Sequence, residues 1–296
     1  MGVLDGHGPL GHHASAFLKQ HLPVALVDEL GQAAAPVPPA ATDPGPARAT
    51  LAAEALTTCF LDADAALGKS VDCQYSGSTA VVSLLEGRRL TTAWVGDSRA
   101  VLVRQEQWGL RGLALTRDHK PTGTEERARI LAAGGRVDRL SDSRGQPVGP
   151  ARVWLGESWV PGLAMSRALG DIVAHSAGVS SHPDVSVMEV TPQDRFLILA
   201  SDGVWEFMDC QAAADLVAGC TSAEEACRTV RAGCWSWCGF GGSWGDACFC
   251  WFRTTSADAA AAAAAAAAVC GPLSRVPPSC PAAAGEHRME PVDARG

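Results

Sequence analysis

LILASDGVW, at residues 197–205, is an apolar, strand-like run that ends in Asp202-Gly203. A second run, VLDGHG at residues 3–8, ends in Asp5-Gly6. A strand that stops at Asp-Gly delivers a carboxylate to the edge of a sheet, and the glycine lets the backbone turn or lets its carbonyl oxygen approach an ion. Two such carboxylates, far apart in sequence, are what a site for hard divalent cations needs.

The two Asp-Gly runs suggest a division of roles at one site. Asp5 would bridge two ions with help from the Gly6 carbonyl oxygen, and Asp202 would be a second carboxylate ligand. His7, two residues after Asp5, would act as general acid to a leaving oxygen. Asp-Gly is also a common turn signal, so an ordinary turn and a surface histidine remain the alternative for each residue taken alone.

Helical and strand-like segments are segregated along the chain rather than strictly alternating. This order favours an α+β fold with antiparallel sheet over a parallel βαβ architecture. The spacing of apolar residues predicts helices over 11–30, 51–67, 122–133, 211–218 and 223–232. Alternation and Gly turns predict strands over 78–85, 89–95, 100–104, 185–190 and 195–200, the last two as a pair joined by the turn 191–194.

Composition divides the chain into two parts. Residues 1–253 are predicted to form one domain, with an Ala/Pro/Gly-rich linker or insertion over 31–48 and a divergent Cys/Trp/Gly-rich stretch over 233–253. Residues 254–296 are Ala/Pro-rich and are expected to be a disordered tail.

Charge and cysteine content exclude several classes of protein. The net charge of −8 argues against a nucleic-acid binder, which would normally carry a basic face. No apolar stretch is long enough for membrane insertion, and the N-terminus has no secretory signal pattern. Eleven cysteines is an odd number, so free thiols are expected. An intracellular protein of the cytoplasm or nucleus is predicted.

Six short motifs occur in one order along the chain. They are VLDGHG at 3–8, SGSTA at 76–80, AWVGDSRA at 93–100, LTRDHKP at 115–121, LAMSRALGD at 163–171 and ASDGVW at 200–205. Together they resemble the metal-dependent protein phosphatases of type 2C, the PPM family, over about residues 1–232. The form GPLGH at 8–12 is closer to plant and algal members than to animal ones.

The resemblance implies an αββα sandwich, in which two antiparallel β-sheets are flanked by helices, with a metal site at one end. It also implies hydrolysis of phosphoserine and phosphothreonine in proteins by a metal-activated water, using two Mg²⁺ or Mn²⁺ ions and in some cases a third. By position, Asp5 is similar to the bridging ligand, Gly6 to the carbonyl ligand, His7 to the general acid and Asp202 to a ligand of the first ion.

Further residues take their roles from the same resemblance. Asp118 is similar to the aspartate that binds the third ion, helped by Asp202 and by Glu206. His119 and Lys120 are expected to order the loop that carries Asp118. Arg167 and Asp171 are expected to form a supporting ion pair.

The chain departs from the family pattern at both ends. Family members have a preceding segment with a phosphate-binding arginine and a Glu-Asp pair, so the first strands are expected to be missing and the domain truncated. Near the C-terminus, Asp246 is the only candidate for the last metal ligand, and its neighbours do not match. Cys234-x₃-Cys238 and Cys248-x-Cys250 suggest zinc, although these are not the usual paired knuckles. An altered reading frame or retained intron would equally explain this run.

Three hypotheses follow. The chain is an active protein serine/threonine phosphatase acting on phosphoproteins, or it is a catalytically impaired relative that binds phosphoproteins or kinases. The third hypothesis is a gene-model fragment of a longer product.

Overall fold

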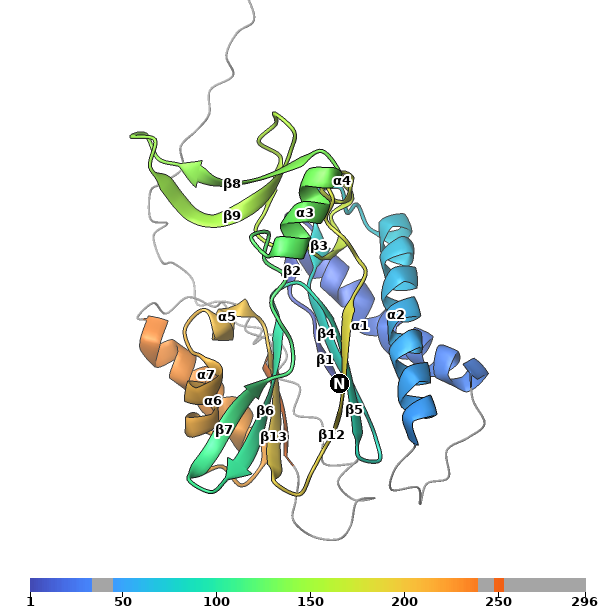
Figure 1. Cartoon of the computed structure of the whole chain (residues 1–296), viewed down its shortest axis with the longest axis vertical. Helices are drawn as coiled ribbons and strands as arrows, with labels where there is room; N and C mark the ends of the chain where they lie inside the picture. The colour runs from blue at the N-terminus through green and yellow to red at the C-terminus, as the bar shows by residue number, and fades with distance from the viewer. Residues whose placement is uncertain (34–44, 239–247, 253–296) are drawn as a thin grey trace, which may run out of the picture.

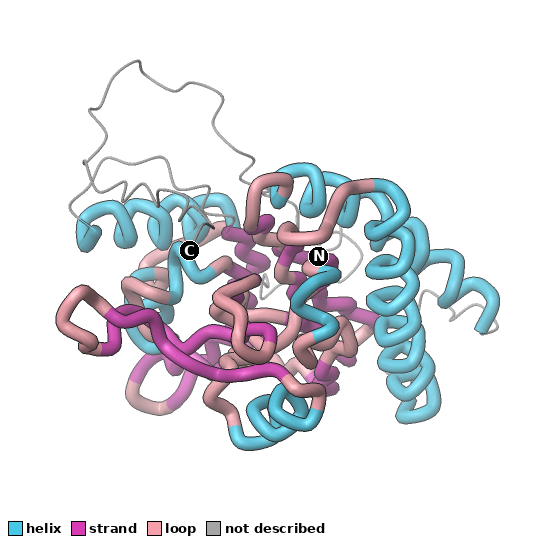
Figure 2. Tube along the Cα trace, turned by 90° about the horizontal axis from the view of Figure 1, so that it is seen from above, coloured by secondary structure: helices cyan, strands magenta, loops and turns pink. Residues whose placement is uncertain are grey.

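Two four-stranded antiparallel sheets lie face to face in the computed structural model, which describes residues 1–33, 45–238 and 248–252 (Figure 1). The first sheet has the order β1-β4-β5-β12, and the second has the order β14-β13-β6-β7. Seen from above, helices flank the strands on both sides (Figure 2). The predicted αββα sandwich is therefore confirmed.

The first sheet is covered by two long helices. Its strands are β1 (Gly2–Val3), β4 (Ala80–Glu86), β5 (Arg89–Val95) and β12 (Asp184–Glu189), and its helices are α1 (Gly11–Ala33) and α2 (Gly45–Ser70). On α2, Leu56, Phe60, Ala63 and Leu67 recur at helical spacing and are all buried against the sheet. This apolar stripe explains why the segment forms a helix that packs on one face.

The second sheet is covered on its outer face by helices from the C-terminal half. Its strands are β6 (Arg99–Glu106), β7 (Gly109–Ala114), β13 (Asp194–Ala200) and β14 (Cys248–Phe252), and its helices are α5 (Asp202–Trp205), α6 (Cys210–Leu216) and α7 (Ala223–Cys238).

Alternation along β6 and β13 divides the core into layers. Leu102, Leu197 and Leu199 pack between the two sheets, whereas Val101 and Val103 pack on the outer face with α6 and α7. Successive strand residues point to opposite faces, so a strand buried on both faces must be apolar throughout. Residues 196–200 of β13 (FLILA) meet this requirement, whereas the strand begins with the polar Asp194 and Arg195.

Two small sheets lie beside the sandwich, next to two short helices. One is β11-β3-β2, formed by Leu169–Gly170, Gly77–Ser78 and Gly6–His7. The other is β10-β9-β8, formed by Pro161–Leu163, Pro147–Leu155 and Gly135–Ser141. The helices are α3 (Thr124–Ala132) and α4 (Ile172–Ser176). The first small sheet is the one that matters for chemistry, since it contains Gly6 and His7.

Two expectations about local structure were wrong. The predicted pairing of 185–190 with 195–200 does not occur, because β12 pairs with β5 and β13 pairs with β6 and β14. The turn at 191–194 crosses from one sheet to the other. Helices α1 and α2 also extend into the predicted linker at both ends, and residues 34–44 between them lie outside the described residues.

No described helix is long and apolar enough to cross a bilayer.

Candidate metal centre and active site

Asp5 and Asp202 meet at one end of the sandwich, although almost two hundred residues separate them. Asp5 lies between β1 and β2, and Asp202 begins α5 directly after β13. Their side chains are hydrogen-bonded to each other. Burial, followed by the neighbouring carboxylate of Asp202, raises the pKa of Asp5 to about 7.

Backbone contacts fix the position of Asp5. Its N–H donates to Thr79 Oγ1 at 3.1 Å, and its carbonyl oxygen accepts from Thr79 N at 2.9 Å and from Ser78 Oγ at 3.1 Å. Gly6 packs so closely on the start of α1 that a Cβ atom would lie 2.0 Å from the carbonyl oxygen of Gly11. Only glycine fits there, so the Asp-Gly pair is required by packing as well as by turn geometry.

His7 and Asp171 form a second side-chain pair in the site. His7 Nε2 lies 2.5 Å from Asp171 Oδ2. Burial lowers the pKa of His7, but the hydrogen bond to Asp171 and nearby carboxylates, Asp5 among them, outweigh it and raise the pKa. Nδ1 of His7 is buried and has no hydrogen-bond partner among the described residues. A histidine held in this way keeps its proton to higher pH than usual.

The expected ion pair between Arg167 and Asp171 is wrong. Arg167 instead donates to Glu126 Oε1 at 2.7 Å and to Asp184 Oδ1 at 2.7 Å, while Asp171 faces His7. Asp171 follows β11 of the same small sheet that holds His7, and this register decides its partner. The sequence contains a carboxylate near an arginine but no signal that the strand pairing turns it towards a histidine.

Asp118 and Glu206 occupy different environments. Both carboxylate oxygens of Asp118 accept from Arg99, at 2.9 Å each, and the Arg99 guanidinium lies 5.5 Å from the centroid of the Trp205 ring. Glu206 follows α5, and burial, then the charge of Asp202, raises its pKa. Glu206 thus lies in the field of Asp202, whereas a cation at Asp118 would compete with Arg99.

Asp97 and Lys120 add a further charged pair that the sequence did not suggest. Lys120 Nζ lies 2.6 Å from Asp97 Oδ2, and Asp97 is only 4% exposed. Asp97 acts electrostatically on Asp5 and on Glu206, whose pKa values it helps to raise. His119 does order this loop, as predicted, since its Nδ1 accepts from Gly96 N at 3.2 Å.

Several predicted ligands lie outside the described part of the chain. Asp246 is one of them, and so are the side chains of Cys238, Cys248 and Cys250 that were considered for zinc. These assignments stay predictions.

The donor chemistry at Asp5 and Asp202 fits a hard divalent cation. Two carboxylates in hydrogen-bond contact repel each other when both are ionised, and a cation between them would remove that repulsion. Within the described residues, no group of three or more His, Cys, Asp or Glu side chains is spaced to hold an ion. The pair would therefore need backbone carbonyl oxygens, such as that of Gly6, and water to complete the coordination.

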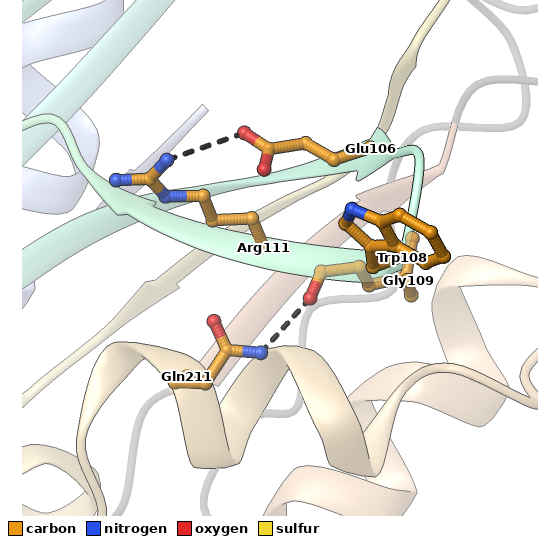
Figure 3. Close-up of a pocket in the computed structure, with 6 residues that line it drawn as sticks. Glu106, Trp108, Gly109, Arg111 and Gln211 are labelled. Atoms are coloured by element: carbon orange, nitrogen blue, oxygen red, sulfur yellow. Dashed lines mark hydrogen bonds and ion pairs between the residues drawn. The ribbon is translucent and has the colours of Figure 1, made fainter.

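A pocket of about 220 Å³ lies elsewhere, between the turn joining β6 to β7 and helix α6 (Figure 3). Glu106, Trp108, Gly109, Leu110, Arg111 and Gln211 line it. Gln211 Nε2 donates to Leu110 O at 2.9 Å, and Trp108 is 92% exposed. The pocket lies at the far end of β6 from Arg99, so it is separate from the carboxylate site.

Comparison with known proteins identifies relatives of this chain. Residues 1–236 match the family described as "Protein phosphatase 2C". "Probable protein phosphatase 2C 64" of Oryza sativa subsp. japonica is 40% identical over 231 residues, covering 77% of this chain and 51% of the relative. "Probable protein phosphatase 2C 73" of Arabidopsis thaliana is 34% identical over 238 residues, covering 77% of this chain and 63% of the relative. The chain thus spans about half the length of the rice relative, and these plant relatives agree with the plant-like form of the motifs.

A solved structure gives the same picture of the fold. The serine-threonine phosphatase 2C from Toxoplasma gondii is 26% identical, with a TM-score of 0.63, over 79% of this chain and 78% of that one. The sequence motifs and the arrangement of the strands therefore point to the same group of proteins.

Proposed function

Because this chain belongs to the protein phosphatase 2C family, we propose that it removes phosphate from phosphoserine and phosphothreonine in proteins, with Mg²⁺ or Mn²⁺ as cofactor. The observation that carries the proposal is the contact between the Asp5 and Asp202 carboxylates. Two half-buried carboxylates this close together repel each other when both are ionised, and a divalent cation between them would remove that repulsion.

The proposed ligands are Asp5, the carbonyl oxygen of Gly6 and Asp202. Divalent cations at such a site lower the pKa of water and neutralise charge on a phosphoryl group. Asp118 and Glu206 are proposed for a further ion, for which Asp118 would have to exchange its contact with Arg99. Asp246 is proposed to complete the first site.

His7 is the proposed general acid. Its raised pKa keeps the imidazole protonated, so it can give a proton to the serine or threonine oxygen that leaves when the P–O bond breaks. Asp171 is a positioning residue, since it holds the imidazole at 2.5 Å and stabilises its positive charge.

Phosphoproteins are the proposed partners, and an intracellular location, in the cytoplasm or nucleus, is part of the proposal. Cys59, Cys73, Cys210 and Cys220 are thiols in the structure, which is usual for proteins of reducing compartments. The net charge of −8 makes nucleic acid an unsuitable partner.

The test is release of phosphate from a phosphothreonine peptide in the presence and absence of Mn²⁺. We expect Mn²⁺-dependent turnover that falls about 1,000-fold or more in Asp202→Asn. Asp62→Asn is the matched control, because Asp62 is exposed on α2, and it should keep full turnover.

The opposite results have distinct meanings. A wild-type protein that binds Mn²⁺ and the peptide without turnover would replace the enzyme by a phosphoprotein-binding protein. Turnover that is unchanged in Asp202→Asn would show that the Asp5–Asp202 pair is not the active site.

A further inference from the structure

We propose that Lys120 is a phosphate-binding residue, whose ammonium group donates to the phosphate of a substrate or product at the Asp5–Asp202 site. The inference rests on the proposed function and deepens it, because it names a side chain that would recognise the phosphoryl group itself.

The loop that carries Lys120 is attached to the same edge of the sandwich as Asp202. His119 N donates to Gly96 O at 3.0 Å, and Gly96 N donates to His119 Nδ1 at 3.2 Å. The turn of residues 96–98 leads into β6, where Arg99 is paired in register with Ala200. Asp202 follows two residues after Ala200, so the Lys120 loop and Asp202 share one end of the second sheet.

A chain of short contacts joins this turn to Asp5. Ser98 Oγ lies 2.6 Å from Thr79 Oγ1, and Thr79 Oγ1 accepts from Asp5 N at 3.1 Å. Asp97, the neighbour of Ser98, holds Lys120 Nζ at 2.6 Å. These contacts therefore connect the ammonium group of Lys120 to Asp5, the residue proposed to bridge the ions.

Lys120 has donors to spare. An ammonium group carries three N–H donors, and Asp97 accepts from it at one contact. The Lys120 side chain is 44% exposed, whereas the Asp97 side chain is 5% exposed. A buried acceptor thus anchors the ammonium group, and its other donors remain accessible to a ligand.

Two arginines in this region, Arg99 and Arg167, already bind protein carboxylates. Arg99 gives two parallel hydrogen bonds to Asp118, and Arg167 contacts Glu126 and Asp184. Lys120, by contrast, acts on Glu206, where its charge lowers a pKa that burial and Asp202 raise. Its positive charge therefore reaches the carboxylate cluster where a phosphate dianion would have to bind.

A purely structural role is the competing explanation. In that case Lys120 would only neutralise the buried Asp97, and removing either member of the pair would have the same consequence. Phosphate binding predicts instead that the two substitutions differ. This difference forms the basis of the experiment.

The experiment measures the affinity of the Mn²⁺-loaded protein for inorganic phosphate by calorimetry, alongside Mn²⁺ affinity and thermal stability. We expect Lys120→Met to weaken phosphate binding roughly 10- to 100-fold, as for loss of a hydrogen bond between charged groups, with Mn²⁺ affinity retained. Asp97→Asn, which breaks the same ion pair but keeps the ammonium, should bind phosphate as well as the wild type.

Further variants make the result independent of folding. Lys120→Arg should retain binding, and Lys120→Gln should lose it even though its amide can still donate to Asp97. Lys69→Met is the matched control, since Lys69 is exposed at the end of α2. Equal losses in Lys120→Met and Asp97→Asn, or no loss in Lys120→Gln, would overturn the inference.

The outcomes also separate this inference from the proposed function. Turnover of a phosphothreonine peptide with unchanged phosphate affinity in Lys120→Gln leaves the phosphatase intact and removes Lys120 from it. Phosphate binding that depends on Lys120, in a protein without turnover, supports the binding site and rejects the enzyme. A wild-type protein that does not bind inorganic phosphate overturns the inference.

Discussion

The carboxylates of Asp5 and Glu126 lie in opposite electrostatic surroundings. Asp5 contacts another carboxylate, Asp202, and its pKa is raised to about 7. Burial alone would raise the pKa of Glu126 too, but hydrogen bonds from Arg129, Arg167 and Ser166 lower it well below its usual range. Glu126 is therefore neutralised by the protein itself, whereas Asp5 faces another carboxylate, and a divalent cation is proposed to neutralise that pair.

This difference distinguishes a network that holds the fold together from the pair of carboxylates proposed for chemistry. The Glu126 network joins α3 to the loop before β11 and to β12, with distances of 2.8 Å to Arg129, 2.7 Å to Arg167 and 2.5 Å to Ser166. Every strong donor there has a carboxylate or carbonyl partner in the protein. At Asp5 and Asp202, by contrast, acceptor meets acceptor, which is the arrangement expected where function rather than stability decides the residues.

The largest effect should come from breaking the Glu126 network. Arg167→Met leaves Glu126 and Asp184 without their shared partner, so we expect the free energy of unfolding to fall by about 3 kcal/mol, measured by denaturant unfolding. The control is Arg228→Met, which removes an exposed pair with Glu224 and should change stability by less than about 0.5 kcal/mol. Equal effects of the two variants would mean that the Glu126 network does not stabilise the fold.

A second prediction concerns the hydrogen-bonded pair of His7 and Asp171. If Asp171 positions a general acid, Asp171→Asn should slow turnover of a phosphothreonine peptide about tenfold more than turnover of p-nitrophenyl phosphate, whose leaving group needs no proton. The measurement is the ratio of kcat for the two substrates. An equal loss for both would indicate that Asp171 only supports the backbone around β11.

Removing the repulsion between Asp5 and Asp202 should, in contrast, stabilise the metal-free protein. Without metal, Asp202→Asn removes the charge that raises the pKa of Asp5, so we expect the free energy of unfolding to increase by about 1 kcal/mol. With Mn²⁺ added, the wild type should gain thermal stability and the variant should not. A metal-free variant that is less stable than the wild type would contradict the idea of repulsion between the two carboxylates.

The smallest effect is the pH dependence of the stability that the Glu126 network contributes. The pKa of Glu126 is lower in the folded protein than in the unfolded chain, so its stabilisation is complete above the unfolded pKa of about 4.3 and is lost as the pH falls below it. Between pH 7 and pH 4 the wild type should lose about 0.6 kcal/mol more than Glu126→Gln, measured by urea unfolding at each pH. An identical pH slope in both proteins would mean that Glu126 is not held ionised by its arginines.

Much of the fold was accessible from the sequence because local signals agree with it. The helical spacing of Leu51, Ala55, Leu56, Phe60 and Leu67 predicted a helix over 51–67, which lies within α2, and the change of period with Gly turns predicted the central strands. Strand partners were less accessible, since alternation shows which residues are buried but not which neighbour a strand will choose. The turn at 191–194 has the composition of a hairpin, yet it joins β12 of one sheet to β13 of the other.

The sequence by itself determined the family, the α+β class and the identity of the residues proposed for chemistry, because short motifs such as VLDGHG and ASDGVW place carboxylates at the ends of strands. Only the tertiary structure decided the partners of those residues. It turned Asp171 towards His7 rather than Arg167, gave Asp118 to Arg99 and brought Lys120 to Asp97. Charge partners depend on strand register and loop docking, which long-range packing sets and no local pattern encodes.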